Sequence, residues 1–145
     1  MHVVAFAPSL GAVLNDACGV NAHGFPLTSA SVESLPAQIT VSLVLAVYTQ
    51  GGTDYEPERF IIARSPQGET VGELQCRWHW PDSPGDPVKF RVFAHQLPLR
   101  LPTTGVYTIG FYESRHGTDT PHQFPLPVHK ANPFGISASS SAQRM

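Results

Sequence analysis

Charged side chains are scarce in this sequence. Lys, Arg, Asp and Glu together make up 14% of the residues, whereas about 25% is usual in soluble globular domains. The formal net charge is −2, and Lys and Arg form no cluster longer than a pair. Proteins that bind nucleic acid normally carry a basic patch, because phosphates attract Lys and Arg. The sequence therefore predicts a weakly charged surface and no nucleic-acid partner.

Long apolar runs are also missing. No stretch approaches the roughly 20 apolar residues of a membrane-spanning helix, and no Lys or Arg precedes the first apolar stretch, as a secretory signal would require. We therefore expect a soluble, cytoplasmic protein with no membrane contact. In that compartment Cys18 and Cys76 are expected to be free thiols, although the spacing alone leaves a disulfide between them open.

Motifs for catalysis and for metal binding are absent as well. Structural zinc sites use close pairs of Cys and His, but the nearest histidines, His116 and His122, are six residues apart. No glycine-rich phosphate loop precedes a helix, and no serine lies in a strand-to-helix elbow. Cys76 falls in an alternating apolar run, where a small buried side chain is the ordinary interpretation. We expect no catalytic residues, no metal site and no cofactor, with calcium as a minor alternative.

Proline is abundant instead. The 14 prolines lie between apolar runs rather than in one tract, a spacing that helices tolerate poorly. Apolar residues alternate from Ile39 to Val47, and Leu74, Cys76, Trp78 and Trp80 share one face of another run. Turn signals recur about every ten residues. This pattern is typical of an all-β sandwich or barrel. We expect an antiparallel β-sandwich of about seven to eight strands with immunoglobulin-like or related Greek-key topology.

The sequence also predicts the limits of the domain and the positions of single segments. Residues 1–130 are expected to form a single domain, followed by a flexible Ser-rich tail over 131–145. Asn15 and Asp16 suit the turn of a hairpin. The segment Leu97–Pro102 reads as an extended crossing, and Phe124–Val128 reads as an exposed edge strand because it contains two prolines.

Four segments carry a resemblance to known proteins: Met1–Phe6, Ser34–Ala37, Leu99–Tyr107 and Phe124–Val128. With them, the sequence resembles a family of small bacterial β-sandwich proteins of unknown function, found especially in actinobacteria, over residues 1 to about 130. The resemblance implies the sandwich fold and a cytoplasmic setting, and it implies no activity. The segment Pro102–Tyr107 also resembles the part of immunoglobulin-like domains in which a tyrosine hydroxyl pins a corner. Tyr107 is otherwise interpreted as a packing residue.

The loops at one end of the predicted sandwich are the candidate binding site. By strand parity, loops 49–57, 81–87 and 114–121 gather at the same end, where binding function is common. Solvated polar loops without a function are the ordinary alternative, and a calcium site from Asp54, Asp82, Asp86 and Asp119 is another. The candidate residues are Asp54, Tyr55, Glu56, Trp80, Asp82, Asp86, Arg115, His116 and Asp119.

These observations favour a non-catalytic protein-interaction or accessory module. Its loop end or its edge strand is expected to contact a protein partner, since Tyr and Trp are enriched at the centres of interfaces. A structural subunit that assembles with itself is an alternative, which the low surface charge would explain. A calcium- or carbohydrate-binding β-sandwich module is another.

Overall fold

The computed structural model describes residues 1–50, 56–81 and 85–131. Within these ranges the chain is all-β, which confirms the predicted class, and no helix there is long and apolar enough to cross a membrane. The strands number ten rather than seven or eight. They are β1 (His2–Ser9), β2 (Gly11–Leu14), β3 (Val20–His23), β4 (Ala30–Val32), β5 (Ala37–Gln50), β6 (Glu58–Arg64), β7 (Thr70–Arg77), β8 (Val88–Leu101), β9 (Gly105–Tyr112) and β10 (Gln123–Lys130).

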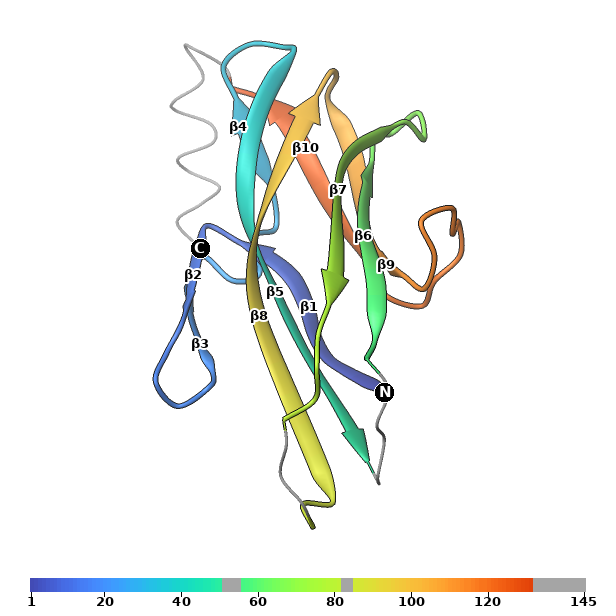
Figure 1. Cartoon of the computed structure of the whole chain (residues 1–145). Coiled ribbons are helices and arrows are strands. Elements are labelled where there is room, and N and C mark those ends of the chain that lie inside the picture. The colour runs from blue at the N-terminus through green and yellow to red at the C-terminus, as the bar shows by residue number, and fades with distance from the viewer. Residues whose placement is uncertain (51–55, 82–84, 132–145) are drawn as a thin grey trace.

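Two larger sheets face one another (Figure 1). One has the strand order β1-β5-β8, and the other has the order β4-β10-β9-β6-β7. Strands β2 and β3 form a separate hairpin around Asn15 and Asp16, as the turn residues predicted. The strand pairs are antiparallel except β4 with β10, which is parallel. The expectation of a purely antiparallel arrangement is therefore wrong at this one edge.

The hydrophobic core lies between the two larger sheets. Alternate residues of β5 from Val41 to Val47 are almost fully buried, and so are Leu97, Leu99 and Leu101 of β8. Side chains of the five-stranded sheet, including Ile61 and Ile109, belong to the same apolar cluster. Because side chains alternate across a strand, each sheet turns one apolar face inward and leaves the other outside.

Strand β8 is longer than the sequence indicates. The expected separate strand at 88–92 and crossing at 97–102 are parts of one strand, Val88–Leu101, which pairs with all fourteen residues of β5. Pro98 is tolerated because β8 is an edge of its sheet and needs no donor on its free side. Strand β7 passes close by at Gly72, where a Cβ would lie 2.6 Å from the carbonyl oxygen of Pro98. Only glycine permits this approach.

Strand β10 is a free edge over 124–127, as its prolines predict, but not at Val128. Its last residues, Val128 to Lys130, pair with β4 on the side away from β9, so the edge assignment is wrong there. Pro125 and Pro127 precede this pairing, and they lie in the part of β10 that pairs with β9 alone. The missing donors of the two prolines therefore cost the β4 pairing nothing. A three-residue strand such as β4 carries too weak a pattern to be predicted.

The end of the described chain is bound to this edge. The Ala131 N–H donates a hydrogen bond of 2.7 Å to the carbonyl oxygen of Val32. The predicted tail, 131–145, begins with this hydrogen-bonded residue, and the rest of it lies outside the described part of the chain.

Tyr107 packs in the core, and it also forms the corner that the resemblance of its segment to immunoglobulin-like domains implies. Its side chain is fully buried, and its hydroxyl donates a hydrogen bond of 2.7 Å to the carbonyl oxygen of Thr103. The Thr103 N–H donates to the same hydroxyl at 3.3 Å. The two bonds hold the turn between β8 and β9 against the core.

The apolar face that begins on β7 and continues past its end at Arg77 generates a prediction of stability. Cys76, Trp78 and Trp80 are buried, which confirms the predicted inward face. Trp78 packs edge-on against Phe93, with 5.2 Å between ring centroids. We expect Trp78→Ala to lower the free energy of unfolding by about 3–5 kcal/mol, because it leaves a large cavity in the core. Urea unfolding followed by circular dichroism measures this difference.

Trp78→Phe is the matched control for this substitution. It keeps an aromatic ring in place and removes no hydrogen bond, since Trp78 Nε1 has no partner within the described residues. Its destabilisation should be clearly smaller. Equal stability of Trp78→Ala and the unmodified protein would contradict the placement of Trp78 in the core.

Candidate functional site

The predicted loop end is only partly within the described residues. Asp54, Tyr55 and Asp82 lie outside them. Gln50 at the end of β5 pairs with Val88 at the start of β8, so these two strand ends lie side by side. An oxygen of Asp86 accepts a hydrogen bond of 3.4 Å from the Val88 N–H, a contact local to its own turn.

Glu56 makes the one ion-pair contact of this loop end in the described chain. Its Oε1 lies 3.1 Å from Nδ1 of His79. Both side chains are exposed, so the contact contributes little to stability. It places a carboxylate and an imidazole side by side in water, an arrangement that does not by itself bind a ligand.

The loop that carries Arg115, His116 and Asp119 follows a different course from the one that strand parity suggests. Arg115 contacts Glu73 of β7 at 3.3 Å and lies over the ring of Phe60. The carbonyl oxygen of Gly117 accepts a hydrogen bond of 2.9 Å from Arg64 at the far end of β6.

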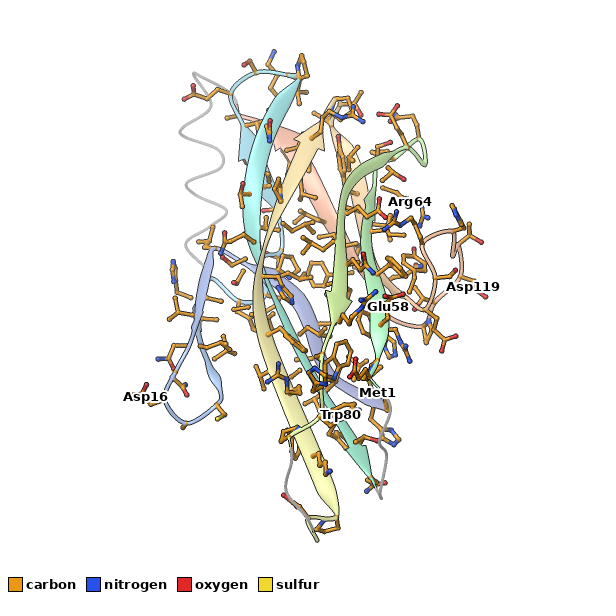
Figure 2. The ribbon with its side chains drawn as sticks, viewed as in Figure 1. Met1, Asp16, Glu58, Arg64, Trp80 and Asp119 are labelled. Carbon is orange, nitrogen blue, oxygen red and sulfur yellow. The ribbon has the colours of Figure 1, made fainter. Side chains whose placement is uncertain are left out.

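This loop therefore folds back along the outer face of the five-stranded sheet, on the side of the molecule opposite the tip of the β2–β3 hairpin at Asp16 (Figure 2). There it covers a small apolar cluster of Phe60, Ile62 and Tyr112. His116 is exposed on the loop. The loop serves as a cover of this face, and a binding role of its polar residues stays a prediction.

Trp80 is buried rather than free at the rim. Its ring meets Trp78 edge-on, with centroids 5.8 Å apart, and Phe93 of β8 stacks on His95 at 5.2 Å. Nε1 of both tryptophans and Nε2 of His95 are buried and have no hydrogen-bond partner within the described chain. These rings form an aromatic cluster at the seam of β7 and β8, where they pack the core instead of contacting a partner.

No metal centre is formed by the described residues. No group of three or more His, Cys, Asp or Glu side chains among them is placed to hold a metal ion. Two of the four aspartates of the calcium hypothesis, Asp54 and Asp82, lie outside the described ranges. Cys18 is exposed and Cys76 is buried, and the two are free thiols as expected. Burial raises the pKa of the Cys76 thiol to about 11, so it stays protonated and unreactive at neutral pH.

The outer face of the three-stranded sheet is a different candidate. Its side chains fall into cross-strand rows, because β1, β5 and β8 pair in register. One row is aromatic, with His2 stacked on Tyr48 at 4.7 Å and Tyr48 against Phe90 at 5.4 Å. The next two rows contain small apolar side chains, Ala5, Ala46 and Val92 in one and Ala7, Val44 and Ala94 in the other.

A polar row closes this face at its other side. The Ser9 hydroxyl donates to the carbonyl oxygen of Ser42 at 2.8 Å, and the Gln96 amide donates to the Ser42 hydroxyl at 2.9 Å. No Asp, Glu, Lys or Arg belongs to any of the four rows. The face is therefore apolar at its centre, with uncharged polar groups along one side.

The β2–β3 hairpin lies beside this sheet (Figure 1). An open hollow of about 440 Å³ lies between the hairpin and the outer face of the sheet. Its floor is Val44, Ala46 and Val92, and the hairpin side contributes Val20 and Ala22. Leu14 pairs with Val20 and so shares its face of the hairpin. Leu14 is 57% exposed and Phe25, which also lines the hollow, is 43% exposed.

We call the rows of small residues, the hollow, Leu14, Phe25 and Phe90 the apolar face. It exposes large side chains beside a hollow lined by apolar side chains and one glycine. Such a surface has no acid, base or nucleophile to carry out chemistry, and it has the composition of a contact surface.

The sequence analysis did not predict this face as a site, although the pattern of one strand indicated it. The second face of the run Ile39–Tyr48 begins polar with Thr40 and Ser42 and then turns apolar at Val44 and Ala46. A strand with one solvated face should stay polar on that face. The change to apolar residues marks the part of the sheet that lines the hollow.

Comparison with family models, curated proteins and solved structures finds no match to this chain. The resemblance drawn from the sequence segments therefore stays a prediction, and the site rests on its geometry alone.

His95 generates a prediction of pH dependence. Burial lowers the pKa of His95, whereas an unfolded histidine has a pKa of about 6.5. At pH values between the folded and the unfolded pKa, His95 therefore binds a proton more readily in the unfolded chain than in the folded one. We expect the stability contributed by neutral His95 to be complete above pH about 6.5 and to fall as pH drops through the lowered pKa. Urea unfolding at pH 7.5 and 5.5 measures the loss.

His95→Gln is the control, because glutamine cannot bind the proton. The variant should lose part of the stability difference between the two pH values. Glu58 does not contribute to this difference. The hydrogen bond from Arg77 is the main cause that lowers the pKa of Glu58, so its carboxylate stays ionised at both pH values. An unchanged pH dependence in His95→Gln would show that other groups cause it.

Proposed function

We propose that this protein is a non-catalytic protein-interaction module built on an immunoglobulin-like β-sandwich. Two observations support this fold. The order β1-β5-β8 against β10-β9-β6 corresponds to the immunoglobulin order A-B-E against G-F-C, with β7 added beside β6. The hydrogen bond from Tyr107 to Thr103 lies where immunoglobulin-like domains have their tyrosine corner. In this assignment, strands β2 to β4 are an insertion between the first two strands of the sandwich.

A cytoplasmic setting belongs to the same proposal. It is supported by Cys18 and Cys76, which are both free thiols. Disulfides are common in domains exposed to oxidising compartments and rare in the cytosol.

The contact surface of the module is the apolar face. The observation that carries this assignment is the exposed Leu14 and Phe25 beside the apolar hollow on an uncharged sheet face. A small-molecule site normally adds a few placed polar groups that orient its ligand. The hollow has no polar side chain in its lining, so an apolar side chain of a protein partner fits it better.

The partner that this surface fits is a second copy of the chain. In a twofold dimer the same patch meets itself, and each residue contact occurs twice. A charged patch would bring like charges together, but the rows of the apolar face contain no charged residue. Projecting side chains and a hollow on one face also allow Leu14 of each copy to enter the hollow of the other.

Self-association is tested by light scattering on a size-exclusion column over protein concentrations from micromolar to millimolar. We expect the mass to rise from one chain to two with concentration. Leu14→Lys should raise the dissociation constant at least about tenfold, because each interface would bury two unpaired ammonium groups. A mass of one chain at every concentration would contradict the assignment and would favour a different protein as partner.

Val106→Lys is the matched control. Val106 is 53% exposed on β9 of the other sheet, close to the exposure of Leu14, and is not part of the apolar face. Its substitution should leave the dissociation constant unchanged. Loss of the dimer in Val106→Lys but not in Leu14→Lys would move the interface to the five-stranded sheet.

A further inference from the structure

A second groove lies away from the apolar face and has a different chemistry. It has a volume of about 440 Å³ and lies between the start of β1 and the loop after β9. Val3, Phe111 and Pro121 contribute apolar surface to its lining, and Arg59, Ser114 and His122 contribute polar groups. Its size falls in the range of about 300–1,000 Å³ that is typical of small-molecule sites.

Arg59 is placed in this groove by the alternation of β6. Ile61 and Ala63 of the same strand are fully buried in the core between the sheets. Arg59 is two residues before Ile61 and so points to the same side of the strand, at the end of the core. Its side chain is only 20% exposed, which is low for an arginine.

The donors of Arg59 are largely unused. Its Nη1 donates a hydrogen bond of 2.9 Å to the carbonyl oxygen of Glu58. Its Nη2 lies 4.0 Å from the carboxylate of Glu113, which is beyond hydrogen-bonding distance, and Glu113 is 89% exposed. A guanidinium has five N–H donors, so most of those of Arg59 have no acceptor within the described chain.

Arg64, the other arginine of β6, differs from Arg59 because it has hydrogen-bond partners in other segments. Arg64 donates to the Tyr112 hydroxyl at 2.8 Å and to the Gly117 carbonyl oxygen at 2.9 Å, and it lies over the Tyr112 ring. These contacts hold the loop after β9 to the sheet, so Arg64 has a structural role. Arg59 holds no such segment. Its unpaired nitrogens are not among the buried atoms without a partner, and the residue lines the groove, so its free donors are accessible to a ligand there.

We propose that this groove binds a small organic carboxylate, with Arg59 as the residue that recognises the anion. The fork of an arginine matches the two oxygens of a carboxylate and donates two parallel hydrogen bonds. Val3, Phe111 and Pro121 offer surface for an apolar or aromatic body attached to the carboxylate. Glu113 and Asp119 also line the groove, and their negative charges disfavour a phosphate dianion relative to a singly charged carboxylate.

Phenylacetate is the probe that tests this site, with phenylacetamide as its uncharged counterpart and inorganic phosphate as the competing anion. Binding is followed by two-dimensional NMR of the amide signals of the full chain. We expect phenylacetate to shift the signals of Glu113, Thr120 and His122 saturably, and the other two compounds to leave them unchanged. Equal binding of phenylacetamide, or no saturable shift with phenylacetate up to its solubility, would overturn the proposal.

Arg59→Met removes the guanidinium and keeps most of the aliphatic side chain. We expect it to weaken phenylacetate binding at least about tenfold, because a charge-assisted bidentate pair is lost. Arg91→Met is the control, since Arg91 lies over Phe93 away from the groove and should leave the affinity unchanged. Unchanged affinity in Arg59→Met would show that a group other than Arg59 binds the carboxylate and would contradict the proposal.

Glu113→Gln tests the same site by removing the carboxylate that would compete with the ligand for Arg59. The substitution carries little risk to folding, because Glu113 is exposed. Removing this carboxylate frees Arg59 and lowers the repulsion of an incoming anion. We expect the affinity for phenylacetate to rise about twofold to fivefold, the range of a weak exposed ion pair. A lower affinity in Glu113→Gln would show that the carboxylate assists the ligand and would contradict the proposed recognition.

Discussion

The hydrogen-bonded ladder between β5 and β8 is the constraint on which the other features depend. Fourteen residues of one strand pair in continuous register with fourteen of the other. This pairing turns Leu43, Leu45, Leu97 and Leu99 toward the core, and the same register places Val44 beside Ala94 and Ala46 beside Val92 on the outside. A shift of one residue in one strand would exchange its two faces. The core and the apolar face are thus two consequences of a single register.

The two larger sheets differ in how their outer faces are covered. On the five-stranded sheet, Arg64 donates one hydrogen bond to Gly117 of the loop after β9 and one to Tyr112 of β9, and the loop covers Phe60, Ile62 and Tyr112. On the three-stranded sheet, the β2–β3 hairpin lies beside the strands and leaves a hollow and exposed side chains. One face is therefore covered by the chain itself, and the other stays partly open. This difference is the physical basis of the proposed function.

Much of the strand pattern was predictable from the sequence. Strand β6 was expected at Arg59–Arg64 and lies at Glu58–Arg64, and the inward face of β7 was predicted from the spacing of Cys76, Trp78 and Trp80. These features depend on alternation within one short segment. Strand β4 was missed, and β8 was divided in two, because their pairing depends on partners far away in the sequence. Pro98 signals a break by local rules, and only its place at a sheet edge makes it acceptable.

The sequence by itself determined the class of fold and the inward faces of the long strands, since both follow from the chemistry of neighbouring residues. The corner at Tyr107 was implied only by the resemblance to immunoglobulin-like domains. The tertiary structure alone decided which outer surfaces stay open. The row of Ala5, Ala46 and Val92 joins three strands from distant parts of the chain. In the same way, Arg59 and Arg64 stand on one strand with the same charge, and only their distant neighbours separate a structural arginine from one with unused donors. Local patterns carry no information about such neighbours, because non-local pairings bring them together.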